Sequence, residues 1–382
     1  MTAPPLGAAL RFEPTRIERV DVATQQLTLR EPHQASWGVM HERHVAYVHV
    51  VTEAADGWSE LATLDEPRYQ PDWTAAAITL IRELVGPRLV GVSATWLDVY
   101  RQLSSEIAGN HPVVAAVADA MLDAQLRARA TSLAAALGVA RGPRWGLTAS
   151  WTDPGLLDRL AAAQEVGLGR LKLKLSVGDV DRGDEVLATI DVIREQAPAV
   201  ILAIDANGRL APDPATMGLL RALARAGVTA IEQPFAPSNW AGARELAQHL
   251  GDSATLVVAD EAASHPDAVA ALLDHHAATA ICIKPGPLGG IAAALAVVEA
   301  CRARSVPHWC GGLLESSVGR ACLVSLAALT PDTPVDFGPS SGYYTNDASA
   351  PTLLGPDGRL ALWFEPGIGP APALPAPALP AS

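Results

Sequence analysis

Five short apolar segments in the middle of the chain each end in a charged residue. They end at Lys174, Asp205, Glu232, Asp260 and Lys284, at intervals of 24 to 31 residues. Each interval is long enough for one strand and one helix, so the pattern predicts repeated βα units. In a (β/α)8-type barrel the carboxyl ends of the strands meet at one open face, where active sites lie. The sequence therefore places three carboxylates and two lysines around one small volume.

The repeat runs from about residue 141 to residue 344. Candidate strands end near eight positions: Ser150, Lys174, Asp205, Glu232, Asp260, Lys284, Cys310 and Asp336. No glycine-rich phosphate fingerprint follows the first strand, which weakens the doubly wound alternative. The predicted fold class is therefore α/β, with a parallel barrel over residues 141–344.

A smaller module precedes the barrel. Residues 15–140 show strand-like alternation first and helical periodicity afterwards, which predicts an α+β unit that residues of about 345–369 complete. Residues 1–14 are interpreted as an N-terminal extension. Residues 370–382 are rich in Pro and Ala and are expected to be a disordered tail.

Composition narrows the class of protein. Hydrophobic residues make up 49% and charged residues 18%, which suits a large buried core. A net charge of −13 disfavours nucleic acid and anionic membranes as partners. The four cysteines lack C-x-x-C spacing, and no signal peptide or spanning apolar run is apparent. The protein is predicted to be cytoplasmic and to act on a small molecule.

Lys172 and Lys174 lie two residues apart, so an extended strand turns both side chains to the same face. In a barrel this face is the interior, where an unpaired lysine is costly. One open interpretation is structural, with one lysine paired to a carboxylate and the other extended outward. The functional interpretation is that nearby positive charge and partial desolvation lower a lysine pKa from about 10.4 toward the range of a general base.

Asp205, Glu232 and Asp260 are expected to converge. Each alone is more often a helix N-cap or an ion-pair partner, but three converging carboxylates raise one another's pKa unless a cation compensates them. Oxygen ligands suit Mg²⁺, with Mn²⁺ as a substitute. Asn207 shares a face with Asp205 and is expected to orient it by a hydrogen bond. Glu261 is expected to point away from this set.

Lys284 ends the sixth candidate strand and is expected to face Lys174 across a bound substrate. The structural alternative for Lys284 is an ion pair with Asp260. Two lysines on opposite faces of a metal-held carboxylate suit abstraction of the adjacent proton, since one amine takes the proton while the metal stabilises the enediolate.

Short motifs around these residues resemble those of one enzyme family. They are Lys172-Leu173-Lys174, Asp205-Ala206-Asn207, Glu232-Gln233-Pro234, Asp260-Glu261 and Lys284-Pro285-Gly286. Together they resemble the muconate-cycloisomerase branch of the enolase superfamily. Within that branch, the segment from Trp309 to Ser316 followed by Gly319-Arg320 is similar to o-succinylbenzoate synthases and N-succinylamino acid racemases. Motifs in the first module extend the resemblance over residues 15 to about 370.

The resemblance implies a (β/α)7β TIM-like barrel capped by an α+β domain, with Mg²⁺ held by the three carboxylates. It implies Lys174 as the base and, in a synthase, Lys284 as the group that stabilises the enolate while water is lost syn. In a racemase each of these lysines would handle the proton on one face. Lys172 would tune Lys174 and approach the substrate carboxylate. A lysine base used with magnesium is a general feature of that superfamily.

Substrate contacts and assembly are further implications of the resemblance. The residues expected to contact a small carboxylate substrate are Ser36, Trp37, Tyr69, Ser150 and Glu315. Loop packing remains the alternative for the first two and a rim ion pair for the last. Members of this branch often form homo-oligomers, so the same is expected here.

One departure from the family pattern bears on the reaction. Many racemase-capable relatives carry an arginine three residues after the lysine of strand six, and this chain has Pro287 there. The favoured hypothesis is therefore a Mg²⁺-dependent o-succinylbenzoate synthase of menaquinone biosynthesis, which is a carbon–oxygen lyase. An N-succinylamino acid racemase, alone or as a second activity, stays the main alternative. A cycloisomerase, a dipeptide epimerase and a barrel that binds a metabolite without turnover are weaker ones.

Overall fold

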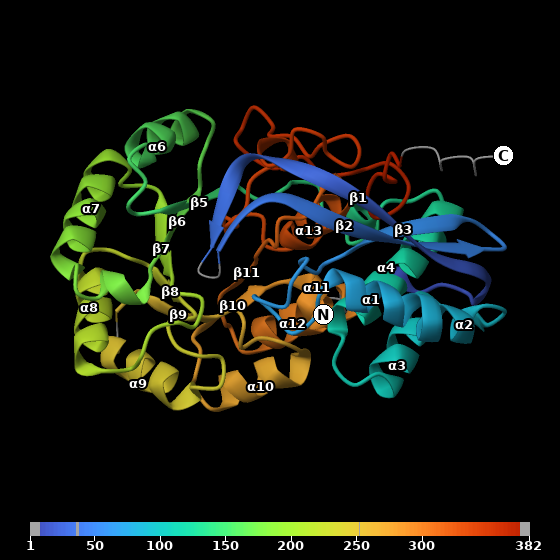
Figure 1. The fold of residues 1–382 in the computed structure, drawn as a ribbon, viewed down its shortest axis with the longest axis horizontal. Helices are drawn as coiled ribbons and strands as arrows, with labels where there is room; N and C mark the ends of the chain where they lie inside the picture. Colours follow the sequence, from blue (N-terminus) through green and yellow to red (C-terminus); the bar gives the residue numbers. More distant parts are fainter. Residues whose placement is uncertain (1–7, 36–37, 252, 375–382) are drawn as a thin grey trace, which may run out of the picture.

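The computed structural model describes residues 8–35, 38–251 and 253–374. Its strands form a four-stranded antiparallel sheet and a seven-stranded parallel sheet. The parallel strands curl into a half-barrel that helices α6 to α10 surround, and the antiparallel sheet lies on the other side of the molecule with α1 to α4 (Figure 1). The predicted α/β class with a second α+β unit is confirmed.

The antiparallel sheet has the strand order β3-β2-β1-β4. Its strands are β1 (Thr15–Ala35), β2 (Gly38–Thr52), β3 (Asp56–Leu61) and β4 (Ser93–Ala94). Both faces of β2 are buried at its centre. Ala46, Val48 and Val50 join the main core, which includes α4, whereas Val45 and Tyr47 pack in a separate cluster with barrel residues. The sheet is therefore fixed to the barrel on one face.

The parallel sheet has the order β11-β10-β9-β8-β7-β6-β5, so each strand pairs with its neighbour in sequence. Its strands are β5 (Gly146–Ser150), β6 (Arg170–Lys174), β7 (Ile201–Asp205), β8 (Ala230–Glu232), β9 (Leu256–Ala259), β10 (Ala280–Ile283) and β11 (His308–Cys310). They are short apolar runs joined by helical crossovers, as expected for strands buried on both faces.

Helices fill the connections. In the first module they are α1 (Thr74–Leu80), a π-helical turn (Ile81–Val85), α2 (Gly86–Leu89), α3 (Trp96–Glu106), α4 (His111–Ala128) and α5 (Leu133–Ala136). Around the barrel they are α6 (Leu156–Glu165), α7 (Gly183–Gln196), α8 (Pro214–Arg225), α9 (Trp240–Leu250), α10 (Pro266–Asp274), α11 (Pro285–Leu288), α12 (Ile291–Ala303) and α13 (Ser317–Ala327). Short 3-10 turns lie at Ala8–Leu10, Val177–Asp179 and Ser340–Gly342.

The predicted eighth strand near Asp336 is not a regular strand. Residues 335–337 instead run beside β5, where the Val335 N–H donates to Arg144 O and the Gly146 N–H donates to Phe337 O. Pro334 and Pro339 flank this segment and lack N–H donors, which limits further pairing. The segment still brings the Asp336 side chain into the barrel.

Close packing joins the two modules. A Cβ on Gly286 of the barrel would lie 2.1 Å from the Cβ of Ala62 in the first module, and within the first module a Cβ on Gly57 would lie 2.2 Å from the backbone of α4. These glycines allow backbones to approach where a side chain would prevent contact. The chain returns to the first module near its end, where the Leu133 N–H donates to Gly367 O and Arg127 donates to Gly369 O.

Two sequence predictions concern the C-terminal tail and membrane-spanning segments. The predicted tail falls mostly on residues 375–382, which lie outside them. Among the residues that are described, no helix has the length and apolar character needed to cross a bilayer.

Candidate active site

Strand register brings the predicted site residues level with one another. Ser150 pairs with Lys174, Lys174 with Asp205, and Asp205 with Glu232. Asp260 follows β9 directly and Lys284 follows β10 directly. Because parallel strands present their carboxyl ends at one edge, these side chains meet at the open end of the half-barrel.

Three carboxylates converge as the sequence predicts. One oxygen each from Asp205, Glu232 and Asp260 lies within 4.8 Å of the other two, and all three residues are buried. Burial raises the pKa of Glu232 to about 8, and nearby carboxylates add to this effect. For Asp205, burial raises the pKa, but the ammonium groups of Lys174 and Lys172 outweigh burial and bring the pKa below its ordinary value.

Lys174 lies at the edge of this carboxylate group. Its Nζ donates to Asp205 Oδ2 at 2.6 Å and to Asn207 Oδ1 at 2.9 Å. The Asn207 backbone, in the left-handed region at φ 45°, donates its N–H to Asp205 Oδ1 at 2.8 Å, and its side-chain amide donates to Asp205 Oδ2 at 3.3 Å. Asn207 therefore contacts the carboxylate, as expected, and also the lysine, which was not expected.

Lys284 follows β10, which is four strands away from the Lys174 strand, β6, in the parallel sheet. Its Nζ donates to Asp260 Oδ2 at 2.6 Å and to the hydroxyl of Tyr69, and it lies 4.7 Å from the centre of the Tyr69 ring. The Tyr69 hydroxyl donates in turn to Asp260 Oδ2 at 3.1 Å. The ion pair of Lys284 with Asp260 and its position across the site from Lys174 were alternative hypotheses. The structure has both.

Lys172 pairs with buried carboxylates, as the structural interpretation of one of the two strand lysines proposes. Its ammonium is 2.6 Å from Asp336 Oδ2 and 2.8 Å from Glu232 Oε1, and its side chain is only 7% exposed. Burial alone lowers the pKa of Lys172, but Asp336 and Glu232 raise it well above its ordinary value. The expected lowering of a lysine pKa by like charge is therefore absent at Lys172, because carboxylates are its nearest neighbours.

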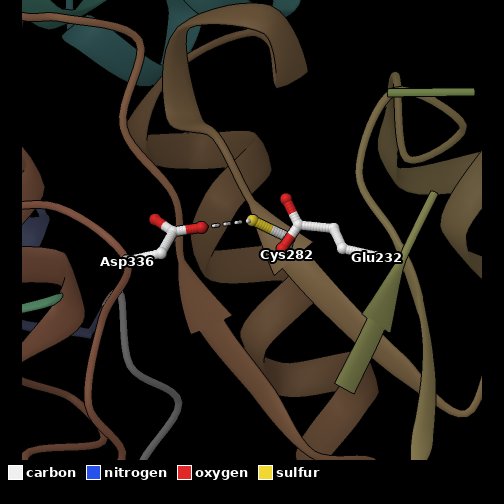
Figure 2. Close-up of side chains that lie close together, drawn as sticks. All are labelled: Glu232, Cys282 and Asp336. Atoms are coloured by element: carbon white, nitrogen blue, oxygen red, sulfur yellow. Dashed lines mark hydrogen bonds between the residues drawn. The ribbon is translucent and has the colours of Figure 1, made fainter. Parts of the chain in front are cut away.

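Sequence reasoning missed Asp336 as a site residue. It was treated only as the end of an eighth strand, although its place in the same spacing was a signal that it faces the barrel interior. Figure 2 shows its carboxylate and that of Glu232 directed toward Cys282. Ligand atoms of these three residues lie within 4.8 Å of one another. Lys172 already supplies positive charge to both carboxylates. Lys172, Glu232, Asp336 and Cys282 together form the buried base of the site, called its floor below.

The carboxylate set fits a hard divalent cation. Glu232 Oε2 is buried and has no hydrogen-bond partner among the described residues. A buried carboxylate oxygen without a donor is costly, and a cation beside it removes that cost. All-oxygen ligation by Asp205, Glu232 and Asp260 suits Mg²⁺ or Mn²⁺.

Glu261 requires a correction. It was expected to point away, but its Oε1 accepts a hydrogen bond from the Asn207 amide at 3.0 Å. Burial, together with Asp260 and Asp205, raises the pKa of Glu261 to about 7. The turn that follows β9 brings consecutive side chains to the same side, which strand alternation does not predict.

A cavity of about 920 Å³ opens onto this charged floor. The predicted residues Tyr69 and Ser150 line it, as do Lys172, Lys174 and Lys284. Ser36 and Trp37 lie outside the described residues, but residues 31–33 of the same hairpin reach the cavity.

Glu315 forms an ion pair, which is the alternative interpretation that the sequence left open for it. It is not among the residues that line the cavity within the described chain. Its Oε1 accepts the Leu313 N–H at 2.7 Å, and its Oε2 lies 3.1 Å from Arg320. Glu315 therefore shapes the wall formed by residues 312–314, because its carboxylate is already engaged by that loop and by α13.

Comparisons with known proteins agree with this architecture. The family model described as "Enolase C-terminal domain-like" matches residues 156–373, and "Mandelate racemase / muconate lactonizing enzyme, N-terminal domain" matches residues 17–138. An N-succinylamino acid racemase of Amycolatopsis sp is 31% identical, over 94% of this chain and 95% of the relative. An o-succinylbenzoate synthase of Bacillus subtilis strain 168 is 26% identical, over 92% of this chain and 93% of the relative.

A solved structure supports the same assignment. A member of the enolase superfamily from Listeria innocua superposes with a TM-score of 0.84 at 25% identity, over 93% of this chain and 94% of that one. The family models together cover both modules, and the converging carboxylates and lysines belong to the second. The chain is therefore a member of the mandelate racemase / muconate lactonizing enzyme family, within the enolase superfamily.

Proposed function

We propose that this enzyme is a Mg²⁺-dependent o-succinylbenzoate synthase that dehydrates a succinyl-hydroxycyclohexadiene carboxylate. One observation carries the proposal. Lys174 and Lys284 enter the same cavity from the ends of β6 and β10, with three strands between them, on either side of the group formed by Asp205, Glu232 and Asp260. This arrangement suits removal of a proton next to a carboxylate, because the resulting negative charge is surrounded by positive groups.

Each residue has a distinct task in the proposed reaction. Lys174, as the free amine, takes the proton, and the Asn207 amide oxygen fixes its Nζ. Lys284 stabilises the developing enolate as an ammonium group that Asp260 and Tyr69 hold in place. Asp205, Glu232 and Asp260 would hold Mg²⁺, which would supply Lewis-acid stabilisation of the substrate carboxylate and the enediolate. Lys172 balances the charge of Glu232 and Asp336 beneath them.

Racemisation of N-succinylamino acids is the second candidate. The relative that is 31% identical is named as such a racemase, and a lysine on each side of the cavity is the arrangement that two-face proton transfer requires. Dehydration stays the first choice because Pro287, in α11, supplies no cation beside Lys284.

A pair of assays decides between these functions. The purified protein with Mg²⁺ is incubated with the hydroxycyclohexadiene substrate, and o-succinylbenzoate is measured by chromatography. In parallel, N-succinylamino acids are incubated in D₂O, and loss of the α-proton signal is followed by NMR. Dehydration is the expected result. Proton exchange without dehydration would assign the racemase, and inactivity in both assays would support a binding protein instead.

A further inference from the structure

The β1–β2 hairpin carries one titratable group into the cavity that the proposed mechanism does not use. This group is His33, which pairs with Met40 after a register shift that begins at Thr28. Within the shifted stretch the hairpin is fixed to the C-terminal loops, since the Arg30 N–H donates to Tyr343 O at 2.8 Å and Arg30 Nε donates to Ser341 O at 2.9 Å. His33 is therefore presented from an anchored part of the hairpin.

The imidazole of His33 lines the same cavity as Lys174 and is half-buried. Burial lowers the pKa of His33 to about 4, and the charge of Lys174 acts in the same direction. The ring is thus neutral near pH 7, with one N–H donor and one acceptor nitrogen. Within residues 8–35, 38–251 and 253–374, no group forms a hydrogen bond or ion pair with it.

Four other uncharged polar side chains that line the cavity are already engaged by the protein. The Ser150 hydroxyl bonds to Thr152 at 2.8 Å, the Ser176 hydroxyl donates to Asp179 at 2.7 Å, and the Thr148 hydroxyl donates to Asp336 O at 3.2 Å. The Asn207 amide is used by Lys174, Asp205 and Glu261. At His33 a neutral donor remains that has no hydrogen-bond partner in the described part of the chain.

We propose that His33 contacts the substrate and donates a hydrogen bond to the hydroxyl that leaves during dehydration. This inference rests on the proposed synthase function. In a syn elimination the hydroxyl departs from the face on which the base lies, which is the face of Lys174. His33 is a donor that the hairpin adds to that side of the cavity.

His33 is chemically unchanged by the proposed dehydration, in which every proton and electron pair is accounted for without it. The Lys174 amine takes the proton from carbon, and the C–H electron pair enters the enediolate. When the carbon–carbon double bond forms, the C–O bond breaks and the oxygen leaves with its electron pair. The Lys174 ammonium then gives its proton to that oxygen, so that water departs and the amine is restored. His33 keeps its own proton and stabilises the negative charge that develops on the leaving oxygen.

The test separates chemistry from binding. His33→Phe keeps a planar ring and removes the N–H donor, whereas His33→Gln restores a donor. The single-turnover dehydration rate is measured for both, and the affinity of Mg²⁺-loaded protein for o-succinylbenzoate is measured by calorimetry. His33→Phe is expected to slow dehydration about tenfold, as for one lost hydrogen bond. Product affinity stays within about twofold because the product lacks the departing hydroxyl, and His33→Gln recovers most of the rate.

His41→Phe is the matched control, since His41 is exposed on β2 of the same hairpin and does not line the cavity. An unchanged dehydration rate in His33→Phe overturns the proposal. A parallel loss of rate and product affinity also overturns it, because that pattern means the substitution altered the cavity. A wild-type protein that neither dehydrates the substrate nor binds the product overturns the synthase function, and the role of His33 with it.

Discussion

Lysine is rare in this protein and is concentrated in the site. Lys and Arg together number 28, but only three of these residues are lysines, and all three contact the carboxylates of the barrel. An arginine side chain does not lose its proton in proteins and cannot act as a base, whereas a lysine can. Arginine supplies positive charge everywhere else. This division supports a role for the lysine amines in proton transfer or in compact charge stabilisation.

Lys174→Ala is expected to slow dehydration by at least about a thousandfold while the protein remains folded, because it removes the base. The Lys174 side chain is 26% exposed, so little packing is lost. Lys172→Ala, in contrast, is expected to destabilise the protein, because it leaves Glu232 and Asp336 without their buried partner. We expect its free energy of unfolding to fall by roughly 3 kcal/mol, in addition to any loss of rate. Steady-state rates and thermal unfolding check both. A Lys174→Ala enzyme with most of the wild-type rate would show that another group is the base.

Helix α12 depends on a carboxylate from the other module. The Ile291 N–H at the start of α12 donates to Asp119 Oδ1 on α4 at 3.0 Å. Gly290, at φ 98°, lies where a Cβ would approach Asp119 Oδ1 to 2.8 Å. Gly290 therefore lets α4 and α12 meet, and the capping module helps to fix the helix that follows the Lys284 strand.

Asp119 gives this contact a dependence on pH. Burial raises the pKa of Asp119 to about 7 in the folded protein, although the Ile291 N–H lowers it, and the ordinary value is 3.8. The folded state then binds the proton more tightly than the unfolded state, so this contribution to stability is greatest at low pH and is lost as the pH rises through about 7. Asp119→Asn keeps an oxygen acceptor and has no such titration.

Relative to the wild type, Asp119→Asn is expected to gain roughly 3 kcal/mol in free energy of unfolding between pH 5 and pH 8. Urea unfolding of both proteins at several pH values measures this difference. The two proteins share all other titrating groups, so the contributions of those groups cancel in the difference between the two unfolding free energies. A stability difference that stays constant with pH would contradict the raised pKa.

At the scale of the whole molecule, the site depends on both modules. The barrel supplies the carboxylates and lysines, while the first module supplies Tyr69 and the hairpin residues that line the same cavity. Buried carboxylates at the centre carry a large desolvation cost, and a bound divalent cation would offset it. Metal binding to the folded state would then stabilise the entire protein.

Mg²⁺ is expected to raise the unfolding temperature, with a gain of about 2.7 kcal/mol at a hundredfold excess over its dissociation constant. A chelator should abolish activity, and added Mg²⁺ should restore it. Glu232→Gln is expected to remove most of the thermal shift because Glu232 provides a buried oxygen without a hydrogen-bond partner among the described residues. Differential scanning fluorimetry measures the shifts. The same stabilisation in the variant would place the cation at another site.

Strand ends were the most predictable part of the fold and of the site. The seven strands from β5 to β11 end at or beside the predicted positions, because short apolar runs before charged residues are a local signal. The eighth strand was predicted but is irregular between two prolines. Glu261 was wrongly expected to point away, because strand alternation does not extend into the turn after β9.

The sequence by itself determined that acidic and amino groups recur at the ends of βα units, since spacing and residue type are properties of the chain. Only the tertiary structure decided which charges are partners. It places Lys172 between Glu232 and Asp336, turns Glu315 into the wall, and brings His33 into the cavity. These outcomes depend on loops and on contacts between modules, where residues far apart in the chain compete for the same partner and burial decides the result.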